Sequence, residues 1–352
     1  MRGLNLEKRI DCFARLGKQL SAYQEMNTIP EEDTYSKVLM QANIANPWFT
    51  WENSHRAFKA ITTMLEKEKL TKWLNPYKDI LNQDFREKKI GVVMAGNIPL
   101  VGFHDYLCVL ISGHRLIVKL SSQDIHLLPF IHQQLCKLDP WWTDRVEFRS
   151  DQIGNVDAII ATGSTNTSRY FQYYFRNIPQ IIRKSRISTA ILTGNETEAD
   201  LGFLAADVMY YFGLGCRNVS MLLLPEDYSY DNLKSGFNAY FYYLDQQKFK
   251  NNYDYYRAVF LINKKPFIEL GPIMLIPDNS WSSPVSVLHY RTYTSRQEVI
   301  SLVQSAEDRL QCVVSIDKWP FLSIMPGKTH IPEPWDYADN IDTILFLQRG
   351  QF

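Results

Sequence analysis

The chain has 352 residues, of which 45% are hydrophobic and 22% charged, a composition typical of ordinary globular proteins and unlike that of disordered or fibrous chains. Its 38 basic and 38 acidic residues cancel, so no net field directs it toward nucleic acid or an anionic membrane surface. We therefore expect a compact protein, with a small molecule and no nucleic acid as its partner.

The amino terminus and the residues that could bind metals exclude further classes. Residues 1–20 mix charged and apolar residues at helical spacing without a continuous apolar run, so we expect no signal peptide, no integral membrane segment and a cytoplasmic location. The seven histidines lack HExxH spacing, and the cysteines lack CxxC pairs, so we expect no metal site and no disulfide framework. The five cysteines are Cys12, Cys108, Cys136, Cys216 and Cys312.

A helical extension is expected over residues 1–87. Residues 4–23 and 54–77 carry apolar residues three and four positions apart, which is the period of amphipathic helices. Two breaks, Thr28-Ile29-Pro30 and Asn46-Pro47-Trp48, predict separate helices packed on the domain that begins at residue 88.

Residues 88–186 predict a doubly wound nucleotide-binding domain of the α/β class. Short apolar runs alternate with amphipathic stretches, the pattern of successive βαβ units with a parallel sheet. The expected strands are 89–96, 114–121 and 155–165, and the expected helices are 100–112, 122–138 and 168–178.

A second α/β domain, the catalytic one, is expected over residues 187–330 by the same pattern. Residues 331–352 come last as a tail with a terminal strand at 340–348. The expected strands of the catalytic domain are 188–194, 219–225, 285–291 and 311–316, with helices at 199–215 and 295–308 and aromatic helical segments up to Leu261.

Two segments of the first α/β domain are candidates for binding a phosphorylated cofactor. Residues 161–168, ATGSTNTS, lead from a strand into a helix, whose N–H groups and dipole attract anions. Within them, Gly163 permits close approach, and Ser164 or Thr165 offers a hydroxyl. Lys119 ends an apolar strand, where ligands of doubly wound sheets bind. The alternatives are an ordinary capped helix and a solvated lysine.

Cys216 and Asn97 are candidates for chemistry at a carbonyl group. Cys216 lies in FGLGCRNVS between a helix and a strand, and the flanking glycines let backbone N–H groups face a bound oxygen. Asn97, in MAGNIPLVG, can donate to an oxyanion without competing for protons. The alternatives are an inert buried cysteine, as we expect for Cys108 and Cys136 on apolar helix faces, and a turn asparagine.

Four short motifs occur one after another along the chain: GNIPL at 96–100, IVKLSS at 117–122, ATGST at 161–165 and GLGC at 213–216. In order and approximate spacing they resemble the WNFPL, VVKPSE, FTGST and GQxC motifs of the aldehyde-dehydrogenase superfamily. The similarity covers about residues 88–316. With its divergent amino terminus, the chain is most similar to the acyl-CoA reductases related to the luminescence fatty-acyl reductase, the LuxC-like family.

This resemblance implies an aldehyde-dehydrogenase-like fold with Cys216 as the nucleophile and Asn97, together with the Cys216 N–H, as the oxyanion hole. The LELGG motif of the superfamily is matched by AILTG, which puts Ile191 in place of a glutamate that activates water. Without that base a thioacyl enzyme is not hydrolysed, whereas exchange with CoA needs no activated water. The resemblance therefore implies an acyl-CoA substrate.

The cofactor residues are also implied by the resemblance. Lys119 is expected to bind the adenosine ribose or its phosphate, and Gly163 and Ser164 are expected to face the pyrophosphate. Ser122 stands where NAD-preferring relatives often carry a glutamate that holds the ribose hydroxyls. Loss of that carboxylate, with Lys119 nearby, favours NADPH, and NADH is left open.

We therefore expect an NADPH-dependent acyl-CoA reductase that forms an aldehyde through a thioacyl enzyme on Cys216. The alternatives are an NAD(P)-dependent aldehyde dehydrogenase and a non-catalytic binding protein on a decayed superfamily fold. A homodimer is left open as the assembly.

Overall fold

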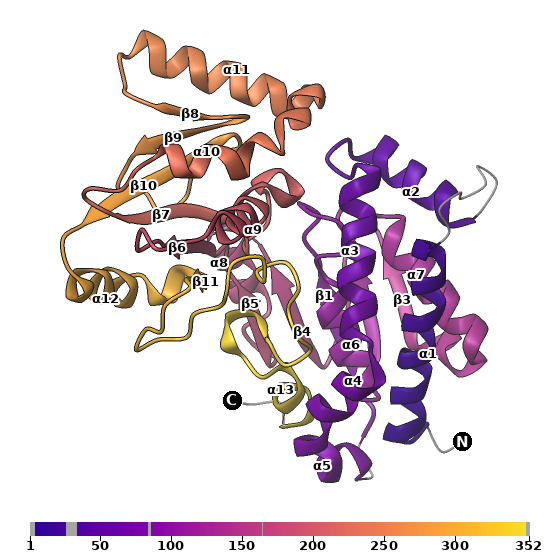
Figure 1. Ribbon diagram of the computed structural model, residues 1–352. Helices are drawn as coiled ribbons and strands as arrows, with labels where there is room; N and C mark the ends of the chain where they lie inside the picture. Colours follow the sequence, from indigo (N-terminus) through magenta and orange to yellow (C-terminus); the bar gives the residue numbers. More distant parts are fainter. Residues whose placement is uncertain (1–3, 26–33, 84–85, 164, 350–352) are drawn as a thin grey trace. The chain divides into compact units, whose positions relative to one another are not determined.

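The computed structural model describes residues 4–25, 34–83, 86–163 and 165–349, and the chain divides into two compact units whose elements are labelled in Figure 1. The first unit comprises Met1–Ser185 and Pro332–Phe352, and the second comprises Arg186–Ile331. Each unit has its own largely parallel sheet, so the α/β class predicted from the sequence is confirmed.

Amphipathic helices precede the first strand: α1 (Leu6–Glu25), α2 (Thr34–Ala45), α3 (Trp51–Met64), α4 (Lys67–Leu74), the 3-10 turn η1 (Asn75–Tyr77) and α5 (Lys78–Asn82). Leu16 and Leu20 of α1 are completely buried, and α1 packs against α3. Thr50 accepts a hydrogen bond from the Asn53 N–H at 3.2 Å and caps α3. This cap explains why α3 begins just after the predicted break at Asn46-Pro47-Trp48.

The rest of the first unit alternates strands with helices: β1 (Lys89–Val93), α6 (Phe103–Ile111), β2 (Arg115–Lys119), α7 (Leu127–Leu138), η2 (Pro140–Arg145), β3 (Val146–Arg149), β4 (Ala158–Thr162), α8 (Thr165–Tyr174) and β5 (Gln180–Arg183). The strands are parallel, in the order β3-β2-β1-β4-β5. The chain builds outward from β1 to β3 and restarts with β4 on the other side of β1. This is a doubly wound sheet whose order reverses between β1 and β4.

The carboxyl-terminal segment forms a short 3-10 turn, η6 (Ala338–Asn340), and then a helix, α13 (Thr343–Arg349). The strand expected at 340–348 is therefore wrong. The Asp342 carboxylate accepts the backbone N–H three residues on at 2.9 Å and caps α13, which packs against α6. A short apolar run has too little periodicity to distinguish a strand from a helix, so the cap and the packing decide its conformation.

A buried ion pair joins three elements of the first unit. Arg183 of β5 donates to the Asp105 carboxylate of α6 at 2.5 Å and to the Thr343 hydroxyl of α13 at 3.2 Å. Because a buried charge is costly without a partner, this pair fixes the carboxyl-terminal helix to the sheet.

The second unit contains β6 (Ile187–Ile191), α9 (Glu198–Met209), η3 (Tyr210–Gly213), β7 (Val219–Pro225), α10 (Asp231–Asn238), η4 (Phe241–Asp245), α11 (Gln247–Ile262), β8 (Ile268–Leu270), β9 (Ile273–Pro277), β10 (Val287–Tyr293), α12 (Arg296–Ser305), η5 (Glu307–Arg309) and β11 (Leu310–Val314). Its sheet has the order β11-β6-β7-β10-β9-β8, and only β8 and β9 pair in antiparallel fashion. The sequence does not predict this short pair. No helix among the residues that the structure describes is long and apolar enough to cross a membrane.

Candidate active site

The carboxyl ends of three adjacent strands gather the loops in which the predicted cofactor residues lie. Val93 of β1 is paired with Lys119 of β2 on one side and with Ala161 of β4 on the other. The loops after these strands therefore leave the sheet at one edge, around the reversal between β1 and β4. In doubly wound sheets this edge binds dinucleotides.

Asn97 lies exposed in the loop after β1. Gly96 permits a close approach to the next loop, because a Cβ at this position would lie 2.5 Å from the Ser121 Oγ. The buried Asp124 carboxylate accepts the Leu100 N–H at 2.9 Å, and Leu100 has a left-handed backbone with a φ of 58°. Burial raises the pKa of Asp124 to about 6, although the hydrogen bonds that its carboxylate accepts from two backbone N–H groups act to lower it. The loop of Asn97 therefore runs close to the next loop at Gly96 and is held by a hydrogen bond at Leu100.

Lys119 is the last residue of β2 and is half-buried, and Ser122 is exposed in the loop after this strand. Within the described part of the chain, the Lys119 ammonium has no hydrogen bond or ion pair with a protein group. A cation without a protein partner at the ligand-binding edge of a sheet is suited to an anionic ligand group.

Gly163 follows β4 directly and donates its N–H to the Arg183 carbonyl at 3.2 Å. A Cβ at this position would lie 3.0 Å from the Thr167 side chain, so only glycine fits here without a shift. Helix α8 begins at Thr165, so the strand delivers the chain to a helix amino terminus as the sequence predicts. Two further predicted groups, the residue Ser164 and the side chain of Thr165, lie outside what the structure describes.

These features fit the phosphates of a dinucleotide. Phosphate groups bind at helix amino termini, where the helix dipole is positive. Helix α8 begins at Thr165, shortly after β4 ends at this edge of the sheet. Lys119 adds a positive charge at the same edge of the sheet. Among the described residues, no group of three His, Cys, Asp or Glu side chains could hold a metal ion.

Cys216 lies in the second unit, in a four-residue turn before β7. The Asn218 N–H donates to the Gly215 carbonyl at 3.1 Å and closes this turn. The Ser188 hydroxyl of β6 donates to the Cys216 carbonyl at 3.0 Å. The cysteine residue is exposed, while its backbone is held by the turn and by the sheet.

The helix before this turn ends earlier than the sequence predicts. Helix α9 ends at Met209, whereas the expected helix extends to Gly215. Tyr211, Phe212 and Gly213 instead have left-handed backbones, with φ values of 53°, 58° and 76°. For a residue other than glycine this conformation costs about 1 to 3 kcal/mol, so it persists only where surrounding contacts impose it. Helical periodicity carries no information about such contacts.

The other cysteines differ from Cys216 in exposure. Cys12, Cys108 and Cys312 are buried and Cys136 is half-buried. The core position expected for Cys108 is therefore confirmed, and that of Cys136 holds in part. Burial raises the pKa of the Cys108 thiol far above its usual value and also raises the pKa values of Cys12 and Cys136. Because the thiolate is the reactive form, these three are poor nucleophiles.

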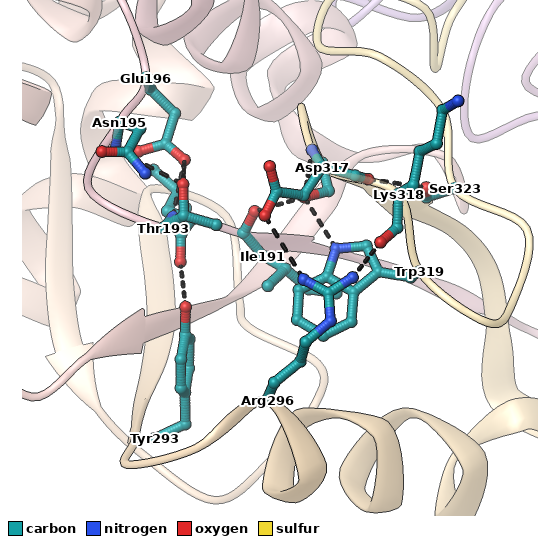
Figure 2. Close-up of polar contacts among 12 residues, drawn as sticks. Ile191, Thr193, Asn195, Glu196, Tyr293, Arg296, Asp317, Lys318, Trp319 and Ser323 are labelled. Atoms are coloured by element: carbon teal, nitrogen blue, oxygen red, sulfur yellow. Dashed lines mark hydrogen bonds and ion pairs between the residues drawn. The ribbon is translucent and has the colours of Figure 1, made fainter.

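Ile191 does not lie where the sequence alignment requires. It is the last residue of β6, it is 1% exposed, and its Cα is paired with that of Leu223. Its side chain belongs to a hydrophobic cluster against which Trp319 packs, and Figure 2 shows it at the carboxyl end of the strand. Cys216 contacts β6 at Ser188. Ser188 precedes Ile191 by three residues, which is roughly 10 Å along a strand. The prediction that Ile191 replaces a base facing Cys216 is therefore wrong.

Three residues near the predicted ones were missed by sequence reasoning. Ser188 and Asn218 hold the Cys216 turn, and Asp124 holds the loop of Asn97. The sequence does carry a weak signal for Asn218 and Asp124. Asn218 is a polar residue directly before the apolar strand β7, and Asp124 is a polar residue two positions after the motif at 117–122. Only the structure shows that both are buried.

Several solved structures share this fold and are aldehyde dehydrogenases. The P. syringae indole-3-acetaldehyde dehydrogenase, as a mutant in complex with NAD+ and IAA, has a TM-score of 0.60 and 13% identity over 88% of this chain and 72% of its own. A Mycobacterium tuberculosis aldehyde dehydrogenase complexed with NAD+ has a TM-score of 0.58 and 14% identity, over 89% of this chain and 74% of its own. A Physcomitrella patens aldehyde dehydrogenase, in complex with the product succinate, has a TM-score of 0.61 and 11% identity, with the same coverage. The aldehyde-dehydrogenase-like fold predicted from the motifs is confirmed.

Sequence comparison with curated proteins finds no match. A model of the family described as acyl-CoA reductase (LuxC) matches residues 2–235. This range is more than half of the chain and includes Asn97, Lys119, Gly163 and Cys216. The chain therefore belongs to the acyl-CoA reductase (LuxC) family, as its motifs indicate.

Proposed function

We propose that this protein is a nicotinamide-dependent acyl-CoA reductase, which converts an acyl-CoA thioester into an aldehyde. The Cys216 thiolate attacks the thioester carbonyl carbon, the carbon–sulfur bond to CoA breaks, and CoA leaves as a thiolate. When bound, the nicotinamide cofactor supplies the hydride that reduces the resulting thioacyl group. The aldehyde then departs and the Cys216 thiolate forms again.

The exposure of Cys216 in a fixed turn is the observation that carries this proposal. The other four cysteines are buried or half-buried, whereas Cys216 is exposed. Hydrogen bonds from Ser188 and within the turn hold its backbone. A nucleophile needs such a fixed position, because it must approach the carbonyl carbon in one orientation. The family to which the chain belongs supports a thioester as the group attacked.

The choice of a thioester over a free aldehyde does not depend on Ile191. An aldehyde dehydrogenase needs a base that activates water to hydrolyse its thioacyl enzyme. Asp207 of α9 is a carboxyl group of the same unit, but it accepts hydrogen bonds from the Gly327 N–H at 2.7 Å and the Thr329 hydroxyl at 2.7 Å. Because these contacts engage its two oxygens, we do not assign it this task.

The direct test of the function is intact-protein mass spectrometry after incubation with acyl-CoAs of several chain lengths and no cofactor. A thioacyl adduct is expected, and it should disappear when NADPH is added, with one aldehyde formed per NADPH oxidised. Oxidation of the corresponding aldehydes by NADP+ should be slow unless CoA is present. Fast aldehyde oxidation without CoA, and no adduct from any acyl-CoA, would instead favour an aldehyde dehydrogenase.

Asn97 is proposed to donate its side-chain N–H to the oxyanion that forms during attack, with the Cys216 N–H as a second donor. Asn97→Ala is expected to lower kcat by about a hundredfold and to change KM little, because an oxyanion donor acts mainly in the transition state. Steady-state kinetics with acyl-CoA measure this. The exposed loop residue Asn195 provides the control, as Asn195→Ala should leave both constants unchanged. A change confined to KM would make Asn97 a turn residue only.

The cofactor is proposed to bind at the carboxyl edge of the first sheet. Lys119 and the start of α8 supply positive charge there, and the glycine at 163 allows close backbone approach. Ser164 and Thr165 are proposed to lie beside the pyrophosphate. Ser122 brings no negative charge, and with Lys119 this favours the 2′-phosphate of NADPH over NADH.

Ser122→Glu is expected to reverse this preference. The new carboxylate repels a 2′-phosphate and accepts hydrogen bonds from a free ribose, so the ratio of kcat/KM for NADPH to that for NADH should fall about tenfold or more. Lys119→Met should lower the same ratio by removing a cation. Gln123→Glu adds an equal charge one residue further on and serves as the control. A ratio within twofold of wild type in both test variants would contradict the assigned cofactor position.

A further inference from the structure

Asn218 closes both sides of the turn that carries Cys216. Its side chain Oδ1 accepts the Gly215 N–H at 2.8 Å, and its own N–H donates to the Gly215 carbonyl at 3.1 Å. Asn218 is 3% exposed, whereas Cys216 is exposed. One buried residue therefore fixes the backbone from which the reactive side chain projects.

The same side chain also binds the end of the preceding helix. The Asn218 Nδ2 lies 3.1 Å, 3.1 Å and 2.7 Å from the carbonyl oxygens of Asp207, Val208 and Tyr210. The last carbonyls of a helix lack intrahelical partners, so the amide acts as a carboxyl-terminal cap of α9. This cap stands just before the left-handed backbone of 211–213, which local sequence preferences oppose.

A second segment braces Asn218 from the other side. The Asp207 carboxylate accepts hydrogen bonds from the Gly327 N–H and the Thr329 hydroxyl, both at 2.7 Å, and burial raises its pKa to about 6. The next residue, His330, places its Nε2 3.2 Å from the Asn218 Nδ2. Asp207, Thr329 and His330 are buried. The helix end, this segment and the Cys216 turn thus form one network of polar contacts, with Asn218 at its centre.

We propose that Asn218 is a positioning residue for Cys216 in acyl transfer, an inference that rests on the function proposed above. A thiolate must approach a thioester carbonyl at a defined distance and angle, and a displacement of about 1 Å can slow such a reaction by about a hundredfold. Asn218 acts on the Cys216 sulfur through the Gly215 peptide and the end of α9. It does not itself bind the substrate.

The test compares the full-length wild type with Asn218→Ala, at a temperature where thermal unfolding shows both to be folded. Intact-protein mass spectrometry measures acylation of Cys216 by octanoyl-CoA and palmitoyl-CoA, and separately its alkylation by iodoacetamide. Acylation is expected to fall about tenfold or more. Alkylation, in which the thiolate displaces iodide to form a thioether, is expected to change less than threefold, because this small reagent reaches the sulfur from many directions.

Ser315→Ala is the matched control. The Ser315 hydroxyl is also buried, donating to the Ile191 carbonyl at 3.1 Å and accepting the Trp319 Nε1–H at 3.0 Å, at the other end of β6. Its loss removes buried hydrogen bonds from the same unit and should leave both rates unchanged. Three outcomes would each overturn this inference without touching the proposed function. They are equal acylation in wild type and Asn218→Ala, an equal loss of acylation and alkylation in Asn218→Ala, and the same loss of acylation in Ser315→Ala. A wild type that forms no acyl adduct would overturn the proposed function as well.

Asn218→Asp keeps the shape and decides the question if the alanine variant does not fold. Burial raises the pKa of the new carboxyl, and its protonated form can again donate to a carbonyl while accepting from Gly215. Its acylation rate relative to wild type should therefore rise as the pH falls from 8.5 to 6.5. The neighbouring charged and titratable groups, Asp207, His330 and Arg217, are common to both proteins. A ratio that does not vary with pH would contradict the hydrogen-bonding role.

Discussion

Replacing Cys216 by serine is expected to slow acyl-CoA reduction by about a thousandfold or more, a loss of about 4 kcal/mol in transition-state stabilisation. The serine hydroxyl stays protonated at neutral pH and is a much weaker nucleophile than a thiolate. Binding of NADPH should stay within twofold of wild type, because the proposed cofactor residues Lys119 and Gly163 belong to the first unit. Acyl-CoA-dependent NADPH oxidation and a fluorescence titration with NADPH measure the two quantities.

Cys136 provides the control for this substitution. It is half-buried on α7 of the first unit, so Cys136→Ser changes the same atoms in a cysteine that the proposed mechanism does not use. This variant should keep its activity. If Cys216→Ser retains activity within tenfold of wild type, Cys216 is not the nucleophile.

The Ile191→Glu variant is expected to lose about 4 kcal/mol of unfolding free energy and to release no more free acid from acyl-CoA than wild type does. The substitution removes an apolar side chain from a packed cluster and puts a carboxyl group there without a partner. Burial raises the pKa of that carboxyl above its unfolded value of about 4.3. The loss should therefore grow as the pH rises from about 4 and become constant above the raised pKa. Urea unfolding at several pH values measures this.

Leu322→Glu is the matched control for Ile191→Glu. The same charge is introduced at a residue of the second unit that is 83% exposed, where no desolvation occurs. Its unfolding free energy should stay within about 0.5 kcal/mol of wild type. An Ile191→Glu protein as stable as wild type that hydrolyses octanoyl-CoA without NADPH would show that this side chain does reach the nucleophile.

The strands that carry the candidate residues could be predicted because their signal is local. Buried parallel strands are short apolar runs, and each of β1, β2, β4 and β7 is such a run. Asn97, Lys119 and Gly163 lie at or just after the ends of such runs, so parallel pairing of the strands brings their loops to one edge of the sheet. The terminal helix α13 was mistaken for a strand because its seven residues are too few for a period to be recognised.

Alignment by short motifs had a different weakness, which Ile191 illustrates. AILTG matches LELGG only at a few apolar and small residues, and such residues occur in any buried strand. A displaced match therefore looks as good as a correct one. The structure separates them, because the Ile191 side chain is buried in a hydrophobic cluster at the end of β6, while Cys216 contacts a residue near the beginning of the same strand.

The sequence by itself determined the α/β class, most of the strands and helices, the family, and Cys216 as the candidate nucleophile, because each depends on residue types within a few positions of one another. Tertiary structure alone decided that Asn218 is buried, that α9 ends at Met209 in a left-handed segment, and that the Cys216 turn is tied to His330. These features depend on contacts between residues up to 123 positions apart. Local propensity opposes the left-handed backbone and says nothing of the partners that hold it, so only the folded chain, with those partners in place, makes it stable.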